Sequence, residues 1–449
     1  MSGTGEEPGA FTTFRQFFAL ERDVLVLSLA MFAFSLGFQM TGRYMPRYLS
    51  VIGAGSVAIG LYGSFGNLVS AVYPYPGGAL SDRIGSRTAL TLFGLASTVG
   101  FLAWFLADPL AAIPLGPTNL GVLVVFLGLT LSQAWKSFGL GATFAVVKQA
   151  VAPGRLAAGF ASTETFRRTA FLLGPLLAAA FVGAFAFREG FRYVLLVAAG
   201  FGLVATVAQH VMYDASEDSL GKAFAGVETV VDDLRGLPAP LRPLLIGDTL
   251  VRFANGMVYV FFVIVVTEFL RVGATLPRVG ALSPDAFFGV LLAVEMVVAL
   301  LTMVPVARLA ERVGLKPVVG LGFAVYAVFP VLLINAPEGA IGLTLPGLGA
   351  VTLPAAAVLA ALFAFSGLRF AGLPAHKALI VGPAEADAGG RVTGSYYLVR
   401  NALTIPSAAV GGYLYQVASP ELAFGVATVV GLVGTGYFLV FGEEFEAYA

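Results

Sequence analysis

The sequence predicts an all-α membrane protein in which twelve transmembrane helices form two pseudo-symmetric six-helix halves. Three observations support this prediction: an apolar composition, twelve apolar stretches long enough to cross a bilayer, and a charged segment that recurs half a chain later. Of the 449 residues, 58% are hydrophobic and 12% are charged, and the mean hydropathy is +0.88. Because soluble domains carry about 25% charged residues, we expect most of this chain to contact lipid or the interior of a helix bundle.

The composition also restricts the chemistry of the chain. It has no cysteine and two histidines, His210 and His376, which lie far apart and near the ends of apolar stretches. Thiolate metal sites and cysteine nucleophiles are therefore excluded. Two histidines far apart in sequence also argue against a histidine-rich centre. The formal net charge of zero indicates no nucleic-acid partner. We expect no enzyme activity, no metal ion and no cofactor, and we expect both histidines to lie at the membrane interfaces.

Twelve stretches approach the roughly 20 apolar residues that a transmembrane helix needs. They cover residues 24–42, 56–77, 88–107, 120–147, 158–186, 191–212, 243–269, 286–306, 317–336, 350–376, 391–416 and 421–441. An even number places both termini on one side. With the N-terminus inside, the cytoplasmic segments carry more than twice as many Lys and Arg residues as the outer segments, which include Arg43 and Arg47. By the positive-inside rule, we expect a multi-pass protein of the cell membrane with both termini in the cytoplasm.

A charged segment between the second and third stretches has a second copy between the eighth and ninth. Residues 78–87 read GALSDRIGSR and residues 307–316 read ARLAERVGLK. The offset, 311 − 82 = 229, is about half of the 449 residues. Two membrane halves related by duplication are typical of secondary transporters. We therefore divide the chain into an N-terminal half over 1–212, a cytoplasmic linker with an amphipathic helix over 213–242, and a C-terminal half over 243–449.

The first copy resembles the loop between helices two and three of the major facilitator superfamily, whose pattern is Gly-x-x-x-Asp-Arg/Lys-x-Gly-x-Arg/Lys. The matching residues are Gly78, Asp82, Arg83, Gly85 and Arg87. The second copy keeps the pattern at Arg312, Gly314 and Lys316 but has Ala307 in place of the first glycine and Glu311 in place of the aspartate. The resemblance implies a twelve-helix transporter of the prokaryotic type, with these nine residues, Glu311 included, as its gating motif. In that family the acidic residue caps a helix end and pairs with basic groups of a neighbouring helix.

The fifth apolar stretch carries a second, partial resemblance to drug–proton antiporters of the same superfamily. Their glycine-rich pattern survives at Gly174 and Pro175, whereas Ala161, Ala170, Ala178 and Ala179 stand where that pattern has glycine. The resemblance favours export. Small residues also let helices pack closely, and the sequence leaves both interpretations open.

Charged residues inside the apolar stretches are the candidates for the substrate or proton site, since each is costly in lipid and should face the bundle interior. They are Lys136, Glu164, Arg168, Asp248, Arg252, Glu295, Arg369 and Arg400. Glu164 and Arg168, like Asp248 and Arg252, are spaced i,i+4, so each pair can form an ion pair along one helix face. Lys136, Arg369 and Arg400 have no acid nearby in sequence, which favours contact with an anionic substrate group.

The sequence therefore predicts a secondary active transporter that moves a small organic solute across the cell membrane by alternating access. We expect export coupled to protons, with Glu164 or Asp248 as the proton-carrying acid. The alternative is ion-coupled uptake of an organic anion or a sugar. The expected partners are the solute, H⁺ and the lipid bilayer, and we expect a monomer.

The orientation can be tested by cysteine labelling, because the native chain has no cysteine to give a background signal. Single cysteines introduced at Ser86 and Glu444 should react with membrane-impermeant reagents only from the cytoplasm, and one at Asn119 only from outside. Labelling of the Ser86 position on intact cells would reverse the predicted orientation.

Overall fold

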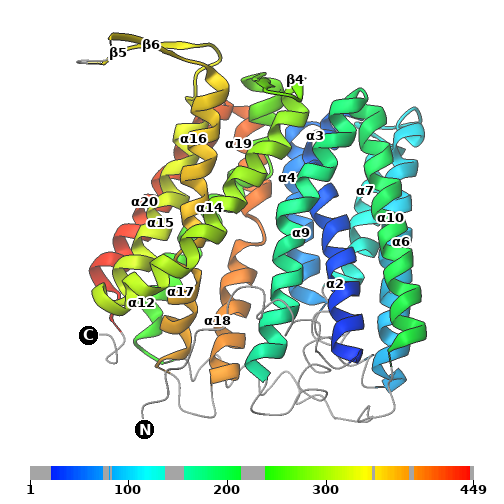
Figure 1. Ribbon diagram of the computed structural model, residues 1–449, viewed down its shortest axis with the longest axis horizontal. Helices are drawn as coiled ribbons and strands as arrows, with labels where there is room; N and C mark the ends of the chain where they lie inside the picture. The colour runs from blue at the N-terminus through cyan, green and yellow to red at the C-terminus, as the bar shows by residue number, and fades with distance from the viewer. Residues whose placement is uncertain are drawn as a thin grey trace.

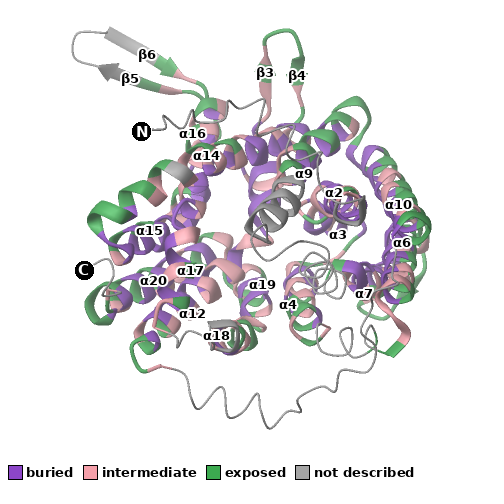
Figure 2. Ribbon diagram, turned by 60° about the horizontal axis from the view of Figure 1, so that its bottom comes forward, coloured by how far each residue is buried: buried purple, intermediate pink, exposed green. Residues whose placement is uncertain are grey.

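The computed structural model describes residues 22–73, 80, 83–136, 156–213, 238–345, 349–383 and 389–444, and these form a bundle of long helices (Figure 1). Helices α2 to α10 gather on one side of the bundle and α12 to α20 on the other (Figures 1 and 2). The first group comprises α2 (Arg22–Thr41), α3 (Met45–Val51), α4 (Ser56–Val72), α6 (Ser86–Leu110), α7 (Leu120–Ala134), α9 (Leu156–Ala184) and α10 (Phe187–Met212). We refer to these two groups as the N-terminal and C-terminal halves.

The C-terminal half contains more breaks than the N-terminal half. Its helices are α12 (Leu241–Tyr259), α13 (Phe262–Ile264), the π-helical turn η3 (Val265–Phe269), α14 (Pro284–Val313), α15 (Leu315–Ile334), α16 (Ala355–Gly367), the 3₁₀ turn η4 (Leu368–Phe370), α17 (Leu373–Val381), α18 (Gly389–Thr404), α19 (Ser407–Val417) and α20 (Pro420–Phe441). Pro406, which has no backbone N–H to donate, separates α18 from α19.

Three antiparallel hairpins connect helices. They pair β1 (Pro114–Leu115) with β2 (Thr118–Asn119), β3 (Ala274–Leu276) with β4 (Gly280–Leu282), and β5 (Ile341–Leu345) with β6 (Gly349–Leu353). The β5–β6 hairpin projects beyond the bundle at the top of Figure 1. We call this end of the bundle the hairpin side and the opposite end, where α6 and α15 begin, the motif side.

A helix lies in each of the twelve predicted ranges, which confirms the helical fold class. In the described part of the chain, six helices are long and apolar enough to cross a membrane, or eight if each of two bent helix pairs counts as one span. The number twelve therefore stays a prediction. The tenth range was wrong at its start, because residues 349–353 form strand β6 and the helix begins only after Pro354. Most of the predicted linker, residues 214–237, lies outside the described residues.

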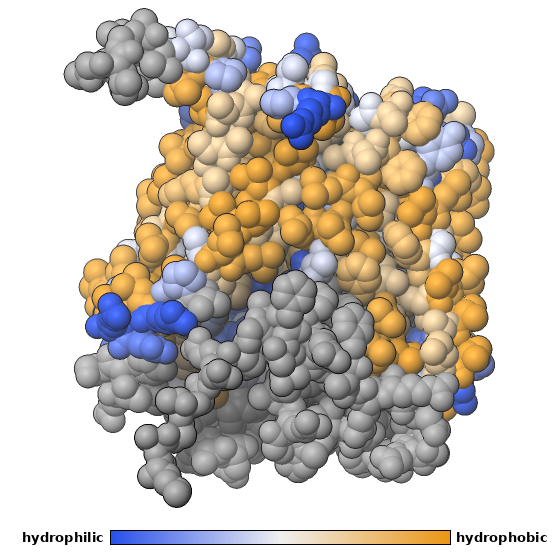
Figure 3. Space-filling view, in the orientation of Figure 1, coloured by the Kyte–Doolittle hydropathy of each residue, from blue (hydrophilic) through white to orange (hydrophobic). Residues whose placement is uncertain are grey.

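The outer surface of the bundle is apolar. Figure 3 shows hydrophobic side chains covering the visible flank of both halves. Large side chains on several helices are exposed, among them Val204, Leu301 and Val440, at 67%, 70% and 71%. Such extensive exposure of large apolar residues is unfavourable in water and is expected where helices contact lipid.

The two halves approach each other closely near the hairpin side. A Cβ atom built on Gly60 of α4 would lie 2.9 Å from the Cα of Gly412 in α19. A Cβ built on Gly289 of α14 would lie 2.7 Å from the Cβ of Ala179 in α9. These distances leave no room for a side chain, so small residues are required where the halves touch.

The glycines of the two motif copies have the same unusual backbone conformation. Gly85 has φ 84 and ψ 150 and precedes α6, while Gly314 has φ 93 and ψ 163 between α14 and α15. Residues with a Cβ are essentially excluded from this region. The shared geometry confirms that the conserved spacing of the two copies corresponds to the same tight reversal between helices.

Gly314→Ala should therefore destabilise the protein by about 1–3 kcal/mol. The added Cβ would also lie 2.5 Å from the Glu444 carboxylate. The matched control is Gly425→Ala in α20, where a Cβ meets no atom within 4 Å; alanine there should be neutral or stabilising by up to about 1 kcal/mol. Thermal unfolding in detergent measures both, and equal midpoints for the two variants would contradict the backbone argument.

Candidate functional site

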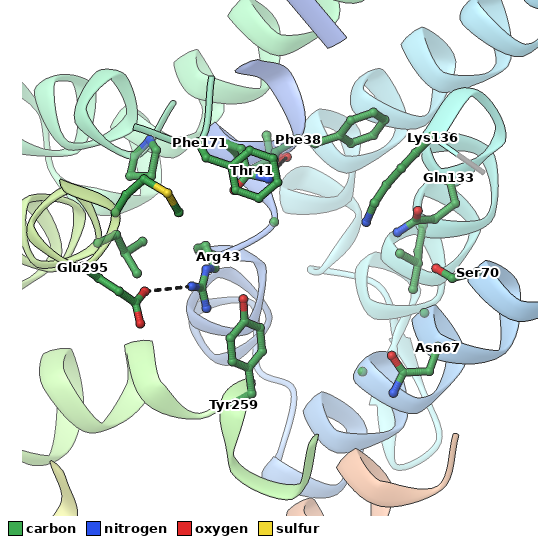
Figure 4. A pocket seen from close by; sticks show the side chains of 18 of the residues that line it. Phe38, Thr41, Arg43, Asn67, Ser70, Gln133, Lys136, Phe171, Tyr259 and Glu295 are labelled. Carbon is green, nitrogen blue, oxygen red and sulfur yellow. Dashed lines mark hydrogen bonds and ion pairs between the residues drawn. The ribbon is translucent and has the colours of Figure 1, made fainter. Parts of the chain in front are cut away.

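A cavity of about 490 Å³ lies between the two halves, and a second cavity of about 250 Å³ adjoins it. The two share Gly63, Asn67 and Tyr259 in their walls. Figure 4 shows polar side chains of the N-terminal half, including Lys136 and Gln133, opposite Glu295 and Tyr259 of the C-terminal half. The larger cavity thus draws its lining from both halves, as a site that is exposed alternately to the two sides requires.

The walls of these cavities are rich in basic side chains. Among the described residues, the larger cavity is lined by Arg43, Lys136, Arg168 and Glu295, and the smaller one by Arg252 and Arg400. Aromatic rings of Phe38, Phe171 and Phe370 complete the larger cavity. The described lining therefore combines five cations and one carboxylate with flat apolar surfaces.

Glu295 of α14 is the carboxylate that joins the two halves at the cavity. Its side chain is 2% exposed, and its Oε1 accepts hydrogen bonds from Arg369 Nη2 and Ser366 Oγ, both at 2.6 Å. Its Oε2 accepts a bond from Arg43 Nη2 at 3.2 Å, drawn in Figure 4. The Arg43 guanidinium also stacks on Tyr259, 4.2 Å from the ring centroid. One buried carboxylate is thus shared by two arginines from different halves.

Arg43 was assigned from the sequence to an outer segment, and this was wrong. Its side chain lines the cavity and is 17% exposed. The chain turns just after α2 ends at Thr41 and continues at once into α3, so Arg43 stays within the bundle. The polar contact with Glu295 explains why a cation is tolerated at this depth.

Asp248 of α12 forms a second charged centre, and its side chain is fully buried. Its Oδ1 accepts a bond from Arg252 Nε at 3.1 Å, so the predicted i,i+4 pair is confirmed. Its Oδ2 accepts bonds from Arg400 Nη1 and Tyr396 OH, both at 3.1 Å. The carboxylate therefore binds two arginines, one from its own helix and one from α18.

Arg369 and Arg400 have no acid nearby in sequence, but each has an acidic partner in the structure. Arg369 pairs with Glu295, and Arg400 pairs with Asp248. The partners are 74 and 152 residues away in sequence, so spacing along one helix could not reveal them. Arg400 also bonds the Asn401 Oδ1 through Nη2, at 2.9 Å, and still lines the smaller cavity.

Tyr326 of α15 lies between the two charged centres. Its hydroxyl accepts a bond of 2.7 Å from Arg252 Nη1, and its ring lies 5.1 Å from the Arg369 guanidinium. The phenol thus contacts one arginine from each centre. Tyr326 was not predicted from the sequence, because a tyrosine within an apolar stretch does not by itself indicate a functional role.

His376 was expected at a membrane interface, and this was wrong. The residue is 4% exposed, and its Nε2 lies 3.2 Å from Asp248 Oδ2. The helix α17 that carries it begins only after the turn η4, which places His376 beside the Asp248 centre. His210, in contrast, is exposed in the last turn of α10, where its Nδ1 lies 3.0 Å from Thr91 Oγ1.

The remaining candidates are only partly described. Arg168 and Lys136 line the larger cavity, and the Lys136 ammonium lies 6.0 Å from the centroid of Phe38. Glu164 belongs to α9, but its side chain lies outside the described part of the chain, so the predicted pair with Arg168 stays a prediction. Within the described residues, no group of three or more acidic or histidine side chains is placed to hold a metal ion.

The described motif residues lie on the motif side, away from the cavities. Gly78 and Asp82 are outside the described residues, whereas Arg83, Glu311 and Arg312 are exposed. Arg87 Nε donates to the His210 carbonyl at 2.7 Å. The Glu444 carboxylate accepts from the Leu315 and Lys316 amides, at 3.0 and 2.8 Å, and so caps the N-terminus of α15. The gating role that the resemblance implies for these residues stays a prediction.

The hairpin side carries an ion-pair cluster that the sequence analysis missed. Arg47 of α3 bonds Glu268 and also Asp285, the latter at 3.0 Å between Nε and Oδ1. Ser50 Oγ donates to Glu268 at 2.6 Å, and Tyr44 OH donates to the Asp285 carbonyl at 2.9 Å. Every one of these bonds joins the two halves, so the cluster holds them together at this end.

The small residues of α9 have a packing role. A Cβ on Gly174 would lie 2.5 Å from the Cβ of Gln39 in α2, and the Pro175 carbonyl faces Gly289 of α14. Close helix approach therefore requires a small residue at Gly174, and the export that the resemblance favours stays a prediction.

The Glu295 centre gives a direct test of these pairings. Arg369→Gln should destabilise the protein by about 3–5 kcal/mol, because it removes a buried partner of a buried carboxylate. The double change Glu295→Gln with Arg369→Gln should cost much less than the two single changes added together. Thermal unfolding in detergent measures the cycle, and strictly additive losses would contradict the pairing.

The comparisons with known proteins agree with this architecture. No profile of a protein family matches the chain. An uncharacterized MFS-type transporter of Methanocaldococcus jannaschii is 21% identical over 427 residues, which cover 94% of this chain and 95% of that protein.

Solved transporter structures share the fold at low sequence identity. A crystal structure of the nucleoside transporter NupG aligns with a TM-score of 0.72 at 12% identity, covering 94% of this chain and all of that one. A POT family transporter in complex with 5-aminolevulinic acid aligns with a TM-score of 0.69 at 13% identity, covering 95% and 99%. A peptide transporter POT in complex with alafosfalin aligns with a TM-score of 0.66 at 16% identity, covering 96% and 98%.

These proteins are transporters and not enzymes, and the likenesses extend along nearly the whole chain. In fold and in sequence, along nearly its whole length, the chain is thus similar to transporters of the major facilitator superfamily type.

Proposed function

We propose that this protein is a secondary active transporter that moves a small organic anion together with protons by alternating access. The observation that carries the proposal is the lining of the two adjoining cavities, where the described side chains include five cations and one carboxylate. A site with this surplus of positive charge attracts negatively charged ligands and disfavours cations. Guanidinium groups also bind carboxylates and phosphates with two parallel hydrogen bonds.

The size and walls of the larger cavity support a small solute. A volume of about 490 Å³ lies within the range of 300–1,000 Å³ that is usual for pockets that bind small molecules. The rings of Phe38, Phe171 and Phe370 offer apolar surface beside the charges. One of the similar structures is in complex with 5-aminolevulinic acid, a small organic acid, in keeping with this class.

Coupling to protons is supported by the buried carboxylates beside the cavities. Asp248 and Glu295 are 0% and 2% exposed, and each binds two arginines. Buried acids at this depth are typical of proton pathways in transporters. The carboxylate–arginine pairs would have to rearrange when the halves move, because the Arg43–Glu295 pair joins one half to the other.

For direction, we propose the alternative, uptake of an organic anion. The expectation of export depended on the small-residue pattern of α9, and the packing of Gly174 against Gln39 gives that glycine a structural role of its own. We further propose that the protein is a monomer in the cell membrane with both termini in the cytoplasm, where the basic loops would lie.

The test is solute flux in proteoliposomes with a pH gradient. The probes are radiolabelled benzoate, succinate and glycerol 3-phosphate, with choline as the cationic control. We expect accumulation of at least one anion that depends on the gradient, and none of choline. Comparison of inverted with right-side-out vesicles separates uptake from export. Absence of flux for all three anions, with transport of choline, would overturn the proposed substrate class.

Lys136→Gln should weaken binding of the transported anion roughly ten- to a hundredfold, as expected for the loss of a charge-assisted hydrogen bond of about 1.5–3 kcal/mol. The matched control is Arg278→Gln, which removes an exposed cation from the β3–β4 hairpin, remote from the cavity lining. Competition with labelled substrate measures the affinity of both variants. Equal affinities in the two variants would show that Lys136 does not belong to the binding site.

A further inference from the structure

One oxygen of the Asp248 carboxylate has more donors than it can accept. Arg400 Nη1 and Tyr396 OH lie 3.1 Å from Oδ2, and His376 Nε2 lies 3.2 Å from the same atom. A carboxylate oxygen offers about two lone-pair directions. Accordingly Arg400 and Tyr396 form aligned hydrogen bonds, and His376 Nε2 is left without a partner in hydrogen-bond geometry. Arg400 and His376 thus compete for one acceptor.

The two competitors differ in their access to the cavity. The Arg400 side chain is 17% exposed and lines the smaller cavity, whereas the His376 side chain is 5% exposed. A ligand in the cavity can therefore reach Arg400 directly, and it can reach His376 only through a change at Asp248. Tyr396, the third donor, is fully buried.

The charged groups beside His376 have a net positive charge while Arg400 stays on Asp248. The groups that face it are Asp248 and Arg252 from α12, Tyr326 from α15, Arg369 from η4, and Tyr396 and Arg400 from α18. Arg369 is already paired with Glu295. Asp248 with its two arginines sums to −1 + 1 + 1 = +1, and a third cation in this buried space is repelled.

We propose that His376 takes up the coupling proton, and that it does so when an anionic group of the substrate draws Arg400 away from Asp248. This inference rests on the proposed function and names the residue that carries its proton. A hydronium ion in the cavity loses one O–H bond as the imidazole gains one N–H bond, which leaves a neutral water, and the imidazolium then donates Nε2–H to the vacated Asp248 oxygen. One negative charge enters with one positive charge, and the net charge of the centre stays +1.

The exchange makes substrate and proton bind together. With Arg400 on the substrate, Asp248 and Arg252 sum to zero, and the buried carboxylate favours a protonated neighbour. Without substrate, Arg400 returns to Asp248 and expels the proton from His376. By linkage, each ligand must strengthen binding of the other by the same factor, which is the requirement for cotransport in one direction.

The test uses the fact that the chain has two histidines, His210 and His376. Protein labelled with ¹³C at histidine Cε1, in detergent, is titrated by NMR from about pH 5.5 to about pH 8.5, the range in which imidazole changes charge. Arg400→Gln removes the competing cation from Asp248 without any ligand. We expect the His376 titration to move upward by about one pH unit or more relative to the unchanged protein. His376→Gln assigns the signals, and exposed His210 is the internal control that should not move.

Two results would overturn the proposal: a His376 titration that is the same with and without Arg400, or a His376 that is already charged at neutral pH in the unchanged protein. In the proteoliposome assay, His376→Gln should abolish accumulation driven by the pH gradient but keep exchange of labelled for unlabelled anion. Retained accumulation would also overturn it. If choline is transported and none of the three probe anions is, the proposed function fails, whereas the NMR titration still decides the charge exchange at Asp248.

Discussion

Two carboxylates in the interior, Asp248 and Glu295, each bind two arginines, and the arrangement of the C-terminal half around the cavities depends on these contacts. An unpaired charge at this depth would cost several kcal/mol. The helices that supply the arginines must therefore hold them within hydrogen-bond distance. Asp248 connects α12 with α18, and Glu295 connects α14 with η4. The breaks at η4 and before α17 place Arg369 and His376 beside these acids.

The same contacts explain how the site can respond to a ligand. At the hairpin side, close helix packing and the Arg47 cluster join the two halves over several bonds. At the cavity, the link between halves includes the hydrogen bond from Arg43 to Glu295. Polar groups that face a cavity can exchange one partner for another at modest cost, whereas interdigitated small residues cannot. We therefore expect ligand binding to change the contacts of the arginines first and the packing between the two halves afterwards.

The candidate site was predictable in part. The rule that charged residues in apolar stretches face the interior identified Asp248, Arg252 and Arg400, and these three meet in the structure. Their partnership was not predictable beyond the i,i+4 pair, because 152 residues separate Arg400 from Asp248. His376 was misplaced because a histidine near the end of an apolar stretch fits an interface equally well. A turn that starts α17 inside the bundle does not change the hydropathy profile of the sequence.

By itself, the sequence determined the helical fold class, the positions of the helices and the pair of charged turns. The length of an apolar stretch and the spacing of glycines are local properties of the sequence. The matching φ angles of Gly85 and Gly314 bear out the prediction from glycine spacing. Only the tertiary structure decided which charges meet, where the halves touch and which side chains line the cavities. Those contacts join helices that are distant along the chain. The energy of these contacts depends on which groups are buried together away from water. The periodicity of residues within one helix does not indicate which groups these are.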